Sequence, residues 1–92
     1  MTITENAHPA VVVYSKPACQ PCRATKRALD MRGVTFTDVD VSPDPAALDY
    51  IKKLGHQQSP VVVVDTADGL VHWSGFNPLE IERHFGHKPK GA

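Results

Sequence analysis

The sequence predicts a single α/β domain in which a four-stranded mixed sheet is flanked by three helices, in the order β-α-β-α-β-β-α. Three observations support this fold class. Two valine-rich runs, residues 11–14 and 61–64, lack polar alternation, as strands covered on both faces do. Three segments with helical periodicity are each followed by a glycine. The turn-rich residues 65–69 join the last two strands and make them antiparallel.

The length and charge of the chain limit the classes of function. With 92 residues and a formal net charge of zero, residues 1–92 are expected to form one domain. Its core should lie within residues 10–86, with flexible ends at 1–9 and 87–92. No overall field favours nucleic acid or an anionic membrane. No apolar run is long enough to cross a bilayer, the first residues lack a signal-peptide pattern, and no large apolar stripe is left uncovered, so we expect a cytoplasmic monomer.

The first βαβ unit follows directly from the pattern. After the strand at 11–14, charged and apolar residues alternate at helical spacing over residues 20–31, and Gly33 lies where a C-terminal glycine cap belongs. Residues 34–41 alternate as a half-buried or edge strand does, with one phase slip near Asp38. A crossover helix between these two strands predicts that they run parallel.

A second helix is predicted to end before Gly55, and two start positions fit the sequence. Its apolar positions are Leu48, Ile51 and Leu54. Ser42 with Pro43, or Asp44 with Pro45, each fit an N-cap followed by a first-turn proline, and the sequence does not distinguish them.

The last part of the chain predicts a hairpin and a third helix. The strand at 61–64 is followed by a returning strand at 70–73. Asn77 fits the N-cap of a helix that carries Ile81 and Phe85 inward.

Cys19 and Cys22 begin the first helix and are the strongest candidates for chemistry. A thiol attacks a disulfide as the thiolate, and the free N–H groups of a helix N-terminus lower a thiol pKa. Cys19 would therefore be the nucleophile, and Cys22, one turn further on, would resolve the mixed disulfide. Lys16 adds positive charge, and Pro21 restrains the turn, so both are expected to tune the redox chemistry.

Other interpretations of the cysteine pair stay open. The two cysteines could be buried structural thiols, or they could ligate an iron–sulfur cluster shared between two subunits. They could also form half of a Cys₂His₂ zinc site completed by His84 and His87. The histidine pair lies much further from the cysteines than in a zinc finger, and the chain has enough core to fold without metal. A redox pair that binds no metal fits the placement between a strand and a helix better.

Ser59 and Pro60 immediately precede the second valine run. Proline is tolerated at the first position of a strand, in a special turn, of which a cis peptide bond is one form. A cis bond would leave the backbone N–H and C=O of Ser59 available to pair with an extended substrate.

Three motifs together resemble a known family. They are "KPACQPC" at residues 16–22, "SPVVVV" at 59–64 and "HWSGFNP" at 72–78. Over roughly residues 10–86 the chain is similar to proteins of the thioredoxin fold, and among them to the glutaredoxin-like NrdH redoxins.

This resemblance implies a function and a set of site residues. It implies a cis Pro60, a nucleophilic Cys19 and a resolving Cys22. The substrate-binding positions it implies are Ser59, Pro60, Trp73, Ser74, Gly75 and Phe76. The protein would carry electrons to the large subunit of class Ib ribonucleotide reductase. It would bind no cofactor, and its Cys19–Cys22 disulfide would be reduced by thioredoxin reductase, with electrons from NADPH rather than glutathione.

Some features differ from the family or have a simpler explanation. Pro21 is more typical of thioredoxin, and His56 replaces the usual aromatic residue. A general thioredoxin or glutaredoxin that acts on many disulfides is therefore the alternative function. Trp73 and Phe76 fit core packing as well as partner contact. The basic residues Lys16, Arg23, Lys26 and Arg27 fit either a solvated helix face or a docking site for an acidic segment.

Overall fold

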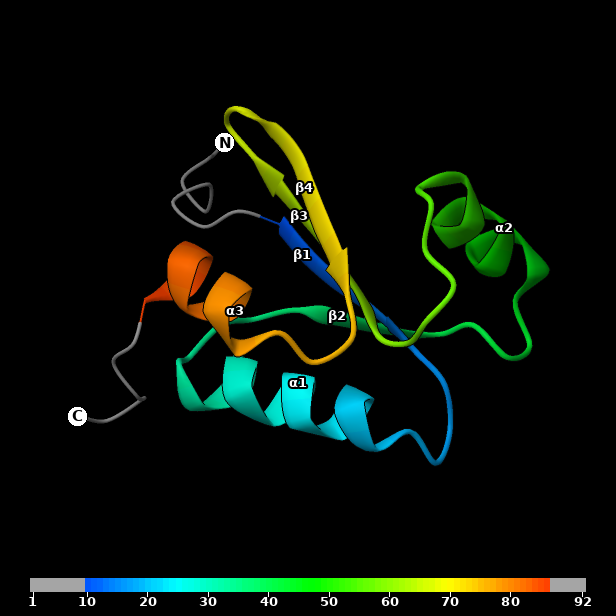
Figure 1. The fold of residues 1–92 in the computed structure, drawn as a ribbon, viewed down its shortest axis with the longest axis horizontal. Helices are drawn as coiled ribbons and strands as arrows, with labels where there is room; N and C mark the ends of the chain where they lie inside the picture. Colours follow the sequence, from blue (N-terminus) through cyan, green and yellow to red (C-terminus); the bar gives the residue numbers. More distant parts are fainter. Residues whose placement is uncertain (1–9, 87–92) are drawn as a thin grey trace, which may run out of the picture.

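The computed structural model describes residues 10–86, and its elements follow the predicted order (Figure 1). These are β1 (Ala10–Ser15), α1 (Gln20–Met31), β2 (Thr37–Asp40), α2 (Pro45–Lys53), β3 (Val61–Thr66), β4 (Gly69–Ser74) and α3 (Pro78–Phe85). The ends for which we expect flexibility, residues 1–9 and 87–92, lie outside this description. Each helix in the described part falls short of the length and apolar character that a bilayer span requires.

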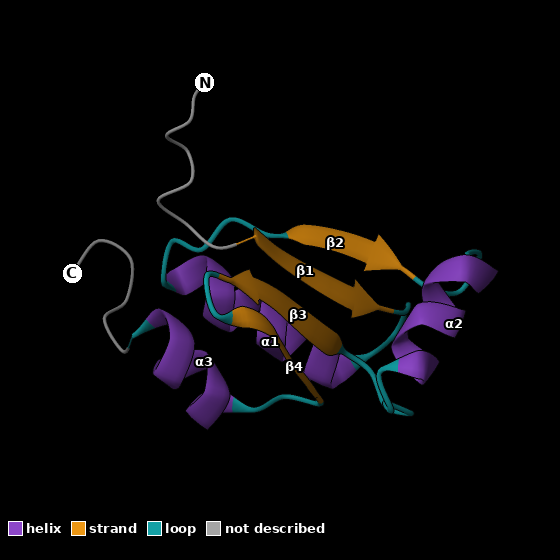
Figure 2. Ribbon diagram, turned by 90° about the horizontal axis from the view of Figure 1, so that it is seen from above, coloured by secondary structure: helices purple, strands orange, loops and turns teal. Residues whose placement is uncertain are grey.

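The four strands form one mixed sheet in the order β2-β1-β3-β4 (Figure 2). β1 runs parallel to β2, and β3 runs antiparallel to both β1 and β4. Both predicted orientations, the parallel first unit and the antiparallel hairpin, are confirmed. The two valine runs form the central strands β1 and β3, which explains why neither alternates with polar residues.

Helices cover both faces of the sheet, as predicted (Figure 1). On one face α1 and α3 enclose a core cluster of Val11, Val13, Leu29, Val62, Val64, Trp73 and Ile81. On the other face α2 covers a smaller cluster of Val41, Ile51, Val61 and Val63. Successive valines of β3 therefore serve opposite clusters, because side chains alternate along a strand.

The caps decide where the helices start. Asp44 is the N-cap of α2, and its carboxylate accepts the Ala47 N–H at 3.1 Å. This contact selects the second of the two predicted starts. Asn77 caps α3 through the Glu80 N–H at 3.2 Å, as predicted.

The predicted start of β2 is wrong. β2 begins only at Thr37, because Val34 donates its N–H to the carbonyl of Leu29 at 3.0 Å and so completes the end of α1. Of the three predicted apolar positions of α2, only Ile51 is fully buried, because a spacing of three residues drifts around the helix and leaves Leu48 exposed.

Candidate active site

The cysteines lie where β1 passes into α1. After the short loop of residues 16–18, Cys19 has extended backbone angles and is the N-cap of α1. Ala18 has a φ of 55°, a left-handed conformation that is uncommon for a residue with a Cβ. Pro21 occupies the first turn, where its missing N–H costs no helical hydrogen bond.

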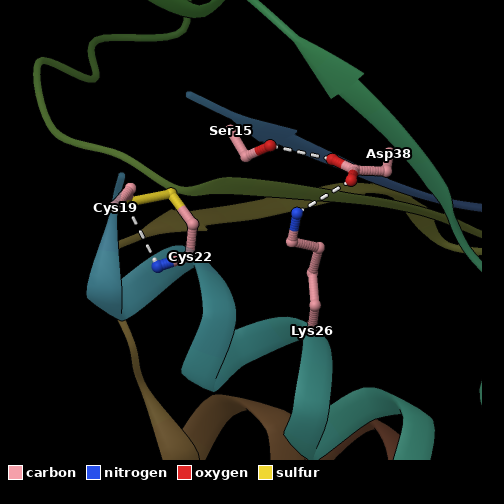
Figure 3. Close-up of a disulfide and its surroundings, with 5 residues drawn as sticks. All are labelled: Ser15, Cys19, Cys22, Lys26 and Asp38. Atoms are coloured by element: carbon pink, nitrogen blue, oxygen red, sulfur yellow. Dashed lines mark hydrogen bonds and ion pairs between the residues drawn. A yellow bond between two sulfur atoms is a disulfide. The ribbon is translucent and has the colours of Figure 1, made fainter. Parts of the chain in front are cut away.

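Cys19 and Cys22 form a disulfide, with their Cα atoms 5.2 Å apart (Figure 3). The Cys22 N–H donates to the Sγ of Cys19 at 3.2 Å. Cys22 is only 1% exposed, whereas Cys19 is half-buried. The helix therefore places one sulfur in the core and the other at the surface, where its first turn offers a hydrogen bond.

A shallow groove of about 600 Å³ runs beside Cys19. Its lining residues are Lys16, Pro17, Ala18, Cys19, Gln20, Pro21, Gln57, Gln58 and Ser59. Ser59 precedes Pro60 through a cis peptide bond, which confirms the geometry implied by the family resemblance. Of the predicted site residues, the structure brings Lys16, Pro21 and Ser59 together around Cys19.

The segment from Trp73 to Phe76 is divided between the core and the surface. Trp73 is buried and stacks on His84, with ring centroids 5.5 Å apart. Gly75 has a φ of 78° and donates its N–H to the Pro60 carbonyl at 2.8 Å. Phe76 is 44% exposed and lies in an open hollow along α1. In this segment, Phe76 thus lies at the surface, whereas Trp73 packs in the core.

A polar network lies next to the disulfide, and it was not predicted from the sequence (Figure 3). Asp38 on β2 accepts hydrogen bonds from Ser15 Oγ and Lys26 Nζ, each at 2.8 Å. Burial raises the pKa of Asp38, but the hydrogen bonds from Lys26 and Ser15 and the Lys26 charge outweigh it and hold the pKa below its ordinary value. The one sequence signal was the phase slip at Asp38, which places a carboxylate on the α1 side of the sheet.

A histidine pair is a second feature that the sequence analysis missed. His56, in the loop after α2, and His72, on β4, bring Nε2 and Nδ1 to 2.7 Å. Their rings meet edge to face, with centroids 4.9 Å apart. Burial, and then the neighbouring His72, lower the pKa of His56. The pair ties the loop that contains Ser59 to the edge strand.

The lowered pKa of His56 predicts a loss of stability in acid. The folded state binds protons less readily than the unfolded chain, so stability is complete above about pH 6.5, the ordinary histidine pKa, and falls as the pH drops below it. We expect His56→Phe, which cannot titrate, to reduce the difference in Tm between pH 8 and pH 5.5. An unchanged difference would show that other groups cause the acid sensitivity.

The zinc interpretation receives no geometric support from the described residues. Within residues 10–86, no three His, Cys, Asp or Glu side chains cluster as metal ligands do. His84, on α3, stacks on Trp73, and its Nε2 lies 3.4 Å from Oε1 of Glu80. His87 lies outside the described residues.

Comparison with known proteins identifies the family. The sequence profile of the glutaredoxin family matches residues 11–67. The glutaredoxin-like protein NrdH of Salmonella typhimurium is 39% identical over 74 residues, which cover 80% of this chain and 86% of the relative.

Comparison with solved structures supports the same family and the thioredoxin fold. The NrdH-redoxin of Escherichia coli, a glutaredoxin-like protein with a thioredoxin-like activity profile, is 36% identical with a TM-score of 0.72, over 80% of this chain and 92% of that one. The thioredoxin of Trypanosoma brucei brucei, at 19% identity and a TM-score of 0.59 over 84% of this chain and 71% of that one, shares the fold. The disulfide at the head of α1, the cis proline beside it and these relatives agree: the chain belongs to the glutaredoxin family, among the NrdH-type thiol–disulfide oxidoreductases of the thioredoxin fold.

Proposed function

We propose that this protein is a cytoplasmic dithiol electron carrier that reduces the large subunit of class Ib ribonucleotide reductase and is itself reduced by thioredoxin reductase. Cys19 is the attacking residue and Cys22 the resolving residue. The observation that carries this assignment is the contrast between the two sulfurs. Cys19 caps α1 beside an open groove, whereas Cys22 is 1% exposed.

The reaction transfers two electrons in two exchanges. The Cys19 thiolate attacks one sulfur of the partner disulfide, which forms a mixed disulfide and releases the other partner sulfur as a thiolate. The Cys22 thiolate then attacks the Cys19 sulfur, which releases the second partner thiolate and leaves the Cys19–Cys22 disulfide. The two partner thiolates take up two protons, which balance the two that the Cys19 and Cys22 thiols lose on ionising. The resolving step is fast because Cys22 is held one turn from Cys19.

The groove beside Cys19 is suited to an extended partner segment. Ser59 lines it opposite the cysteine loop, where the partner's backbone would pair with the backbone of Ser59. Lys16 lies at the same groove and favours an acidic residue near the partner's disulfide. Phe76, exposed in the hollow along α1, provides an apolar contact for the reductase.

Two observations support reduction by thioredoxin reductase. The Escherichia coli relative, a glutaredoxin-like protein, has a thioredoxin-like activity profile. Pro21 between the cysteines is the arrangement typical of thioredoxin. The same proline also supports the second candidate function, a general thioredoxin that reduces many disulfides.

Two coupled assays test the proposal. We expect rapid NADPH oxidation when the oxidised protein is mixed with thioredoxin reductase, and little with glutathione and glutathione reductase. In the second assay, the same system should support turnover of a class Ib ribonucleotide reductase. Activity only in the glutathione system would contradict the proposed electron source. Equal rates with ribonucleotide reductase and an unrelated disulfide protein would favour the general thioredoxin.

A further inference from the structure

The carboxylate of Asp38 connects the three elements that build the site. It binds Ser15, the last residue of β1, and Lys26 in the middle of α1, with both contacts at 2.8 Å. Ser15 is buried, so it fixes one oxygen of the carboxylate, and the other oxygen remains for Lys26. The side chains of Lys26 and Asp38 are 30% and 43% exposed, which leaves the pair partly screened.

Lys26 lies on the same face of α1 as Cys22. Residues four apart on a helix are neighbours, with Cβ atoms about 5–6 Å apart. Long side chains in a helix point toward its N-terminus, which here is the direction of Cys22. Figure 3 shows both side chains projecting from α1 toward the sheet, with the Lys26 ammonium held there by Asp38.

The other charged groups around the disulfide are exposed or bound elsewhere. Lys16 and Arg23 are exposed, and Asp40, on the same face of β2 as Asp38, accepts the Ser42 N–H at 2.9 Å. The groove residues after α2, which are Gln57, Gln58 and Ser59, carry no charge. On α3, Glu80 pairs with Arg83 and His84. Among residues 10–86, the Lys26–Asp38 ion pair thus lies on the side of α1 where Cys22 lies.

We propose that Lys26 and Asp38 are positioning residues with opposite effects on the redox equilibrium of the cysteine pair. Reduction of the disulfide at a pH where one sulfur stays ionised consumes two electrons and one proton and leaves one thiolate and one thiol. The Lys26 ammonium, on the Cys22 side of the pair, favours negative charge on the two cysteine sulfurs and therefore favours the dithiol form over the uncharged disulfide. Asp38 holds the ammonium in place and offsets part of its charge. The inference rests on the proposed redox function of the two cysteines.

Equilibration with glutathione redox buffers of known composition tests this inference. The fraction of free thiol gives the equilibrium constant. We expect Lys26→Met to shift that constant about threefold to tenfold away from the dithiol form, and Asp38→Asn to shift it toward the dithiol form. Lys26→Arg keeps the positive charge and should stay close to the wild type. The thiolate pKa, followed by ultraviolet absorbance, should rise in Lys26→Met and fall in Asp38→Asn.

A second ion pair provides matched controls. Asp49 and Lys53, 3.2 Å apart on α2, lie on the opposite side of the sheet, and both are exposed. Asp49→Asn and Lys53→Met change the net charge equally and should leave the equilibrium constant unchanged. Shifts of the same sign in Lys26→Met and Asp38→Asn, or shifts no larger than the controls, would overturn the inference. This measurement needs neither thioredoxin reductase nor ribonucleotide reductase, so its failure is distinct from failure of the proposed partners.

Discussion

Cys19→Ser is expected to abolish disulfide reduction, whereas Cys22→Ser is expected to stop the reaction at the mixed disulfide. Serine at the N-cap does not ionise near neutral pH, so it supplies no nucleophile. With Cys22 replaced, Cys19 still attacks from its half-buried position beside the groove, but no thiol remains to release it. NADPH oxidation in the coupled thioredoxin reductase assay should be lost in both variants, and intact mass spectrometry should detect a covalent complex only with Cys22→Ser.

The trapped complex also tests which cysteine attacks and which one resolves the mixed disulfide. If Cys19→Ser formed the complex and Cys22→Ser did not, the attacking and resolving roles would be reversed. The protein captured by Cys22→Ser identifies the partner. Recovery of the ribonucleotide reductase large subunit supports the proposed role, whereas a mixture of disulfide proteins without it favours the general thioredoxin.

Ile81→Ala should lower the free energy of unfolding by about 2–5 kcal/mol, because it leaves a cavity where the side chain is now 0% exposed. A domain of this size has a total stability of about 5–15 kcal/mol, so the loss is large. Ile81 joins α3 to Leu29 of α1 and to Trp73 of β4 in one cluster. The substitution therefore loosens the contact that positions α1, and with it the cysteines.

Leu79→Ala on the same helix is the matched control. Leu79 is 71% exposed, and truncating it should change stability by no more than about 0.5 kcal/mol. Urea unfolding of the two variants gives the comparison directly. Equal losses would mean that α3 contributes helix propensity rather than core packing, and a changed denaturant slope in Ile81→Ala would indicate an altered unfolded or native state.

The sequence predicted those parts of the fold that depend on local chemistry. Unbroken valine runs indicated buried strands, and Asn77 and Cys19 are caps where the pattern placed them. The start of α2 could not be predicted, because Ser42 and Asp44 satisfy the same local rules; in the structure, Asp44 is the N-cap.

The parts of the site that the sequence did not reveal depend on long-range register. Asp38 meets Lys26 only because β2 pairs with β1 so that Asp38 lies opposite Val13. His56 meets His72 only because the loop after α2 reaches the edge strand β4. Ala18 gave no signal at all, since alanine is not a residue that favours the left-handed conformation.

The Cys19 sulfur has two roles, one in the reaction and one in the cap of α1. The sulfur that reacts is also the hydrogen-bond acceptor for the first turn of α1, a position where serine, aspartate or asparagine would cap better. Any substitution that improves the cap removes the nucleophile. At this position, selection for catalysis opposes selection for stability, so the protein keeps a weaker helix start as the condition of its activity.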